Sequence, residues 1–117
     1  MPVNSNLKGK RGERELAAKC RKLWPSLAEE LKRGCQNKGG SDSPDVIGLP
    51  GFHIEVKRVQ ALNLDAAMEQ AATDSEGKKI PMVAHRRNRK RWKVTLYLDD
   101  VPEAVRAFTQ IEKGDAA

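Results

Sequence analysis

The chain has 117 residues, the size of one ordinary domain, and 38% of them are hydrophobic. No apolar run approaches the roughly 20 residues of a membrane span, and the polar N-terminus lacks a secretory leader's apolar segment, so we expect a soluble cytoplasmic protein without a membrane partner. The 22 basic residues against 16 acidic ones give a net charge of +6, which indicates a polyanionic partner. Cys20 and Cys35 are too few and too irregularly placed for a disulfide framework or a zinc site, so we expect reduced thiols.

In chain order, the sequence predicts one α/β domain over residues 1–117, with flexible ends at 1–6 and 113–117. Apolar spacing predicts helices at 8–24, 26–31 and 61–73, and a last helix that begins at Asp99 or Asp100 and ends near 111. Ser26 and Asn63 are the expected N-caps of the second and third helices. Strands are expected at 34–36, 46–49, 52–56, 80–84 and 92–98. This order favours a mixed central sheet of about five strands flanked by helices.

Residues 43–58 are predicted to form a hairpin that carries polar groups on one face. Its turn is expected at Pro50-Gly51, because proline fixes φ and glycine accepts a positive φ. Alternation along the second strand places His53, Glu55 and Lys57 on one face, with apolar residues on the other. An acid and an amine side by side on such a strand mark this hairpin as the candidate site.

The register of this hairpin decides whether Asp45 joins that face. A two-residue loop pairs Leu49 with Phe52 and puts Asp45 on the wrong face. A three-residue loop pairs Gly48 with Phe52, and therefore Asp45 with Glu55. Loops of this length typically end in a residue with positive φ, which the glycine of the turn supplies. We therefore predict the three-residue loop and the convergence of Asp45 with Glu55.

Two carboxylates on neighbouring strands offer the hard oxygen ligands that Mg²⁺ or Mn²⁺ prefers. Such an ion lowers the pKa of bound water and neutralises charge on a phosphate under attack. Lys57 is expected in the same site, where it would orient or deprotonate the water or stabilise the transition state. Asp45, Glu55 and Lys57 thus form a candidate phosphodiesterase site, and the alternative is a set of solvated ion pairs on an exposed strand.

Two parts of the sequence resemble one nuclease superfamily. Pro44-Asp45, followed after nine residues by Glu55-Val56-Lys57, resembles the PD-(D/E)XK signature. The segment Gly9-x-x-x-Glu13-Arg14-Glu15-Leu16 resembles the first helix of archaeal-type Holliday junction resolvases and their phage-encoded relatives. Gly40-Ser41 resembles the glycine/serine loop of the same group, and the resemblance covers residues 8–98.

The resemblance implies a restriction-endonuclease-like core and a Mg²⁺-dependent DNA endonuclease in which Mn²⁺ substitutes, in a bacterial or phage-infected cell. It implies Asp45, Glu55 and Glu13 as metal ligands and Lys57 as the catalytic lysine. Glu15 competes with Glu13 for the role of helix acid, and the motif match favours Glu13. The two lie two positions apart and so on different faces of the helix. The rotation of that helix against the sheet decides between them.

Four further residues are weighed for a role in or near the site. Gln70 resembles a glutamine that follows the motif in several branches of the superfamily, and its alternative is an exposed helix amide. Ser41 is a candidate for support of the site through the glycine/serine loop. His53 lies near the turn, and we expect it to be exposed to solvent rather than part of the site. His85, at a strand end, is either exposed or in contact with a phosphate.

Two basic clusters are predicted to bind DNA phosphates without reading sequence. They comprise Lys8, Lys10, Arg11 and Arg14 beside the helix acid, and Arg86, Arg87, Arg89, Lys90 and Arg91 between two strands. Symmetric cleavage of a four-way junction requires two active sites, so a two-fold homodimer is expected. The candidate interfaces are the strand at 92–98 and the last helix with Val101, Val105 and Phe108.

The expected activity is therefore hydrolysis of branched DNA such as Holliday junctions. Alternatives within the nucleases are a nicking, flap or restriction-type enzyme acting on other DNA. An alternative of another class is a basic DNA-binding module with an inactive core, although the intact set of Asp45, Glu55 and Lys57 argues against it. An RNA-binding protein whose acidic hairpin is structural is a further alternative.

Overall fold

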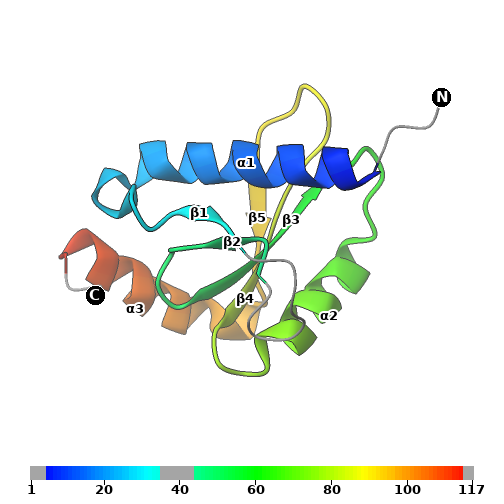
Figure 1. The fold of residues 1–117 in the computed structure, drawn as a ribbon. Coiled ribbons are helices and arrows are strands. Elements are labelled where there is room, and N and C mark those ends of the chain that lie inside the picture. Colours follow the sequence, from blue (N-terminus) through cyan, green and yellow to red (C-terminus); the bar gives the residue numbers. More distant parts are fainter. Residues whose placement is uncertain (1–4, 35–43, 115–117) are drawn as a thin grey trace.

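The structure is a computed structural model that describes residues 5–34 and 44–114. Its elements follow the predicted order of helix, three strands, helix, two strands and helix (Figure 1). They are α1 (Ser5–Leu23), η1 (Pro25–Leu27), β1 (Lys32–Arg33), β2 (Val46–Ile47), β3 (Phe52–Arg58), α2 (Leu64–Ser75), β4 (Ile80–Arg86), β5 (Lys93–Thr95), η3 (Leu98–Asp100) and α3 (Val101–Glu112). The α/β class predicted from the sequence is confirmed.

The five strands form one mixed sheet in the order β1-β2-β3-β4-β5. The first three strands are antiparallel neighbours, β3 and β4 run parallel, and β5 returns antiparallel to β4. A parallel pair requires a crossover, and α2 supplies it between β3 and β4. The prediction of a mixed five-stranded sheet flanked by helices is confirmed.

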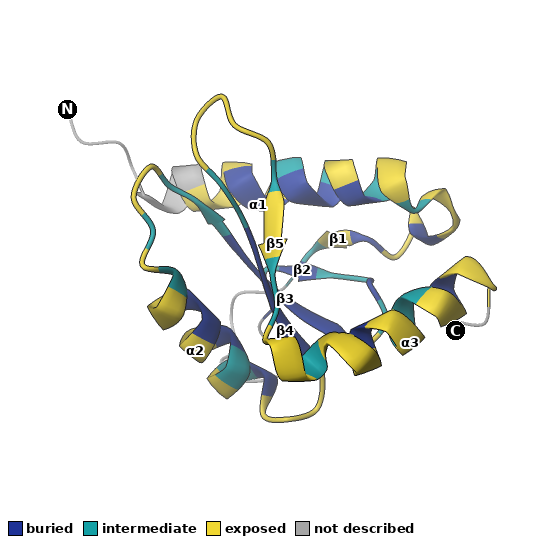
Figure 2. Ribbon diagram, turned by 180° about the vertical axis from the view of Figure 1, so that it is seen from behind, coloured by how far each residue is buried: buried dark blue, intermediate teal, exposed yellow. Residues whose placement is uncertain are grey.

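The sheet is covered on both faces (Figures 1 and 2). On one face, α1 and α3 share an apolar cluster with alternate residues of β3, namely Phe52, Ile54 and Val56. On the other face, apolar residues of α2 pack against Val83 of β4. As a central strand, β3 is therefore buried on both faces, including the face that carries its polar residues. Cys20 lies in the larger cluster as a free thiol.

The helix ends follow local chemistry in part. Asn63 caps α2 as predicted, and its side chain accepts a hydrogen bond of 3.0 Å from the backbone N–H of Ala66. α3 begins after Asp100 with Pro102 in its first turn, although the Asp100 side chain makes no capping bond. Among the described helices, none is both long and apolar enough to cross a membrane.

Several local predictions are wrong. The helix expected at 26–31 is the single 3₁₀ turn η1, because Pro25 opens it, Ser26 provides no cap, and the chain then enters β1. The strand expected at 92–98 is limited to Lys93–Thr95, because the chain turns into η3. Ser5 and Asn6, expected to be flexible, belong to α1. Instead of the strand expected at 34–36, the structure has β1, which ends at Arg33. Gly34 lies outside the strand, and residues 35 and 36 lie outside the described part.

Phe108 of α3 was a candidate for a dimer interface, but it packs into the core. Its ring stacks on Trp24 with 5.9 Å between centroids and tilts against Phe52 at 4.8 Å. Val101 and Val105 of the same helix are exposed. The helix therefore packs a partly buried Phe108 against the core and presents Val101 and Val105 to solvent.

Candidate functional site

The hairpin between β2 and β3 has the predicted register. Val46 pairs with Ile54, which sets Asp45 opposite Glu55 across a three-residue loop. The backbone N–H of Asp45 donates to the carbonyl of Ile54 at 2.8 Å, so the pairing extends to the acid itself. Gly51 closes the loop with a φ of 90°. The two carboxylates therefore face the same side of the sheet.

Asp45 is held in place by the neighbouring strand. The backbone N–H of Val56 donates to its Oδ2 at 2.8 Å. Burial, together with the charge of Glu55, raises the pKa of Asp45 to about 6, while the Val56 hydrogen bond and the charge of Lys57 oppose the increase. Glu55 is only 4% exposed. Glu55 and Lys57 thus both act electrostatically on Asp45.

α1 brings Glu13 to this group. Glu13 is buried, and its Oε2 lies 3.3 Å from the Nε of Arg33 on β1. Burial and the charge of Asp45 raise the pKa of Glu13, whereas Arg33 lowers it. The carboxylate of Glu13 is therefore close enough to Asp45 for the two charges to repel each other.

Glu15 points to a different part of the molecule. Its Oε2 lies 3.3 Å from the Nε of Arg58, a contact of charges without hydrogen-bond geometry. Its Oε1 accepts hydrogen bonds from Arg86 and from the indole N–H of Trp92, the latter at 3.2 Å. Of the two candidate helix acids, the helix rotation therefore turns Glu13 toward Asp45.

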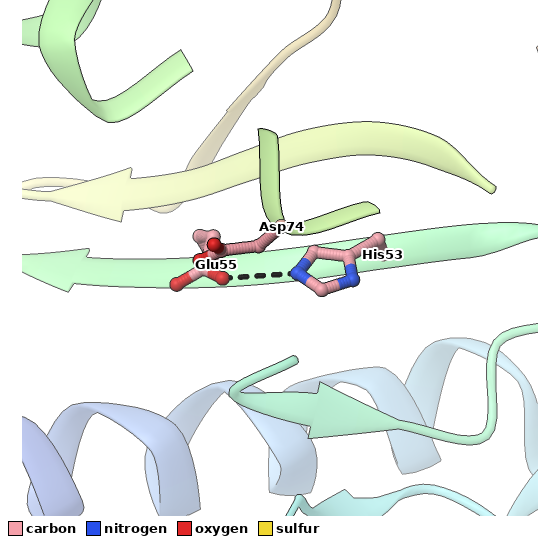
Figure 3. Close-up of side chains that lie close together, drawn as sticks. All are labelled: His53, Glu55 and Asp74. Atoms are coloured by element: carbon pink, nitrogen blue, oxygen red, sulfur yellow. Dashed lines mark hydrogen bonds and ion pairs between the residues drawn. The ribbon is translucent and has the colours of Figure 1, made fainter. Parts of the chain in front are cut away.

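His53 is part of the site, contrary to the prediction that it is exposed. Its side chain is completely buried, and its Nε2 lies 3.0 Å from Oε1 of Glu55 (Figure 3). The strand alternation had placed His53 on the face of Glu55, but the cover that α2 provides was not foreseen. The same packing brings in Asp74, a residue of α2 that sequence reasoning missed because no local pattern links it to β3.

His53, Glu55 and Asp74 each offer a ligand atom within 4.8 Å of the others, so this group can hold a metal ion. Nδ1 of His53 is buried and has no hydrogen-bond partner in the described part of the chain. A buried N–H without an acceptor is more costly than an unused lone pair on one of two ring nitrogens, so we assign the proton to Nε2. His53 then donates to Oε1 of Glu55 and leaves Oε2 for another partner.

A divalent cation would offset the negative charge gathered here, and the group whose ligand atoms lie within 4.8 Å of one another is His53, Glu55 and Asp74. Glu13, Asp45 and Glu55 are carboxylates that repel one another in a largely buried place, and Lys57 and Arg33 are the cations that act on them. Carboxylate oxygens are the ligands that Mg²⁺ or Mn²⁺ prefers in proteins. Comparison with protein-family models, with curated proteins and with solved structures found no match.

Three further residues were candidates from the sequence, namely Gln70, Ser41 and His85. Gln70 is exposed on α2, and the residue of that helix in the cluster is Asp74. Ser41 lies outside the described residues. His85 is half-buried and shares a 2.9 Å hydrogen bond with Thr95, and burial lowers its pKa.

The predicted basic clusters lie on the surface. Lys10, Arg11 and Arg14 are exposed on α1, whereas the side chain of Lys8 is outside the described part. Between β4 and β5, Arg86 is half-buried and the four other cations are exposed, namely Arg87, Arg89, Lys90 and Arg91. Exposed cations of this kind can bind a polyanion without reading its sequence.

Proposed function

We propose that the protein is a divalent-metal-dependent endonuclease that hydrolyses phosphodiester bonds in DNA. The observation that carries this proposal is the convergence of Asp45, Glu55 and Lys57, with Glu13 added from α1. The mixed five-stranded sheet is compatible with the restriction-endonuclease-like core that the sequence motif implies. The exposed cations of α1 and of the β4–β5 connection would bind the DNA backbone.

In this proposal each residue has a defined role. Asp45 and Glu55, with Glu13, would hold Mg²⁺ or Mn²⁺, which when bound lowers the pKa of water and neutralises charge on the phosphate. Lys57 orients the attacking water or donates to a phosphate oxygen as negative charge develops there. Val56 fixes Asp45 through its backbone N–H, and Arg33 fixes Glu13.

Cleavage of a labelled four-way junction in Mg²⁺ tests the active site. We expect Asp45→Asn, Glu55→Gln and Lys57→Ala to reduce cleavage by at least about 100-fold, because each removes a group that acts in the transition state. Binding to the same junction in Ca²⁺ should persist. Glu69→Gln, an exposed acid on α2, is the matched control and should cleave like the wild type. Normal cleavage by the three site variants would refute the assignment.

We further propose that the substrate is branched DNA and that the active form is a homodimer, since symmetric cleavage needs two active sites. A four-way junction, a flap and a linear duplex of equal length should be compared in one assay. Equal cleavage of the linear duplex would contradict the preference for branches. Sedimentation of the free protein as a monomer at micromolar concentration would contradict the dimer.

A further inference from the structure

A basic groove runs between α1 and the connection from β4 to β5. Its volume is ≈ 580 Å³, and it opens to solvent at the surface. Lys19 and Lys22 of α1 form one wall, and Lys90 and Arg91 of the connection form the other. All four side chains are exposed, and within the described residues none of them makes an ion pair. The groove therefore presents four positive charges that no carboxylate of the described chain compensates.

Glu15 also lines the groove. This carboxylate contacts Arg58 and Arg86 and accepts a hydrogen bond from the indole N–H of Trp92. The guanidinium groups of Arg58 and Arg86 already neutralise the negative charge of Glu15. Glu15 therefore does not offset the four cations of the groove walls. The guanidinium of Arg86 lies 5.9 Å from the centroid of the Trp92 ring. Helix and connection are joined through this network.

The connection itself has a defined shape. The backbone N–H of Asn88 donates to the side chain of Gln60, and the N–H of Lys90 donates to the carbonyl of Arg87 at 3.1 Å. Arg89 takes a φ of 63°, which turns the chain sharply at the tip. The connection projects past α1 in both views of the fold (Figures 1 and 2). Its cations are therefore presented by a folded turn, which reduces the ordering that a ligand must impose.

The groove and the carboxylate centre lie on different sides of α1. Glu13 and Glu15 are two residues apart, which rotates their side chains by roughly 200° around the helix. Glu13 contacts Arg33 on β1, at one edge of the sheet, and Glu15 contacts Arg86 at the end of β4. Lys22 lies nine residues beyond Glu13, or about 13 Å along the helix axis. The groove therefore faces away from the carboxylate centre, on the other side of α1.

We propose that this groove binds the backbone phosphates of a second DNA segment, which in a branched substrate is an arm other than the one at the carboxylate centre. Four uncompensated cations on two walls suit a run of phosphates better than a single small anion. This inference rests on the proposed function for the identity of the polyanion. It assigns Lys19 and Lys22, which the sequence motifs did not single out, to DNA binding.

The test reverses charge on one wall at a time. Lys19→Glu/Lys22→Glu alters the helix wall, and Lys90→Glu/Arg91→Glu alters the opposite wall. Lys79→Glu/Lys113→Glu is the matched control, because both lysines are exposed and neither lines the groove. Binding of a fluorescent four-way junction and of a linear duplex is measured by anisotropy in Ca²⁺ at several salt concentrations.

Each groove variant should weaken junction binding at least about tenfold and flatten the dependence of log K on log salt by about 0.9 for every phosphate that the groove no longer binds. Binding to the linear duplex should change less than about twofold, since one segment alone can occupy the carboxylate centre. The control variant, with the same change in net charge, should bind both DNAs like the wild type.

Three results would overturn the proposal. Equal weakening of duplex and junction would make the groove a general contact, and equal weakening by the control would reduce it to net charge. Unchanged junction binding by both groove variants would exclude it as a DNA site. The proposed function is judged separately: if the wild type binds junctions through the groove but never cuts DNA, the nuclease proposal fails and the groove remains.

Discussion

His53 shows how one buried side chain determines the orientation of a candidate metal ligand. Because Nε2 donates to Oε1 of Glu55 at 3.0 Å, that oxygen of the carboxylate is fixed, and Oε2 is left for another partner. Ligand orientation by such neighbours typically changes metal affinity by about 10- to 100-fold. His53 is therefore a positioning residue for Glu55.

Glutamine and leucine at position 53 separate this role from simple packing. The amide nitrogen of His53→Gln can replace Nε2 as the donor, whereas His53→Leu fills the space without a donor. We expect the glutamine variant to bind Mn²⁺ within a few-fold of the wild type and the leucine variant to bind at least about tenfold more weakly. Mn²⁺ titration followed by electron paramagnetic resonance measures this directly. Equal affinities for the two variants would show that His53 only fills space.

Asp45 destabilises the metal-free fold at neutral pH, because its pKa of about 6 lies above the ordinary value of 3.8. A raised carboxyl pKa means that the folded state holds its proton more tightly, so stability from this group is present below pH 3.8 and is lost as the pH rises to about 6. Asp45→Asn removes the charge and keeps an oxygen that can accept from the Val56 N–H.

We therefore expect Asp45→Asn to be more stable than the wild type by about 1 to 3 kcal/mol at pH 7.5 in EDTA, with little difference at pH 3.5. Urea unfolding at the two pH values gives both free energies of unfolding. A variant that is less stable than the wild type at pH 7.5 would show that the charge of Asp45 does not destabilise the folded state.

At the scale of elements, local chemistry predicted some features and tertiary packing decided others. The hairpin register followed from counting residues between Asp45 and Glu55, because side-chain alternation and the loop length leave few choices. Asn63 was recognisable as a cap for the same local reason. In contrast, the helix predicted at 26–31 was wrong, because no local pattern shows that the chain must turn from η1 into β1.

The rotation of α1 is also an element-scale property. Glu13 and Glu15 have the same chemistry and nearly the same position, so only the packing of the helix separates them. Leu16, Ala17 and Cys20 are buried against the sheet, which turns Glu13 toward Asp45. A helical projection of α1 alone therefore cannot tell which of the two acids faces Asp45, because the packing of the helix against the sheet decides it. The place of Asp74 beside Glu55 depends on α2 packing in the same way.

For the whole molecule, the cost of gathering acids in one place predicts a link between metal and stability. Glu13, Asp45 and Glu55 come from α1 and the β2–β3 hairpin, so charge repulsion among them acts against the folded state as a whole. The unfolded chain separates these acids and binds a cation much more weakly. A divalent cation should therefore stabilise the folded protein by mass action.

At a Mn²⁺ concentration of about 100 times Kd, the expected gain is about 2.7 kcal/mol. For a domain of this size that raises Tm by roughly 8 to 14 °C, because each kcal/mol corresponds to about 3 to 5 °C. Glu55→Gln should abolish the shift, and Glu69→Gln should retain it. Differential scanning calorimetry in EDTA and in Mn²⁺ measures both. A shift of the same size in Glu55→Gln would place the stabilising cation elsewhere, since Glu55 belongs to both groups of candidate ligands.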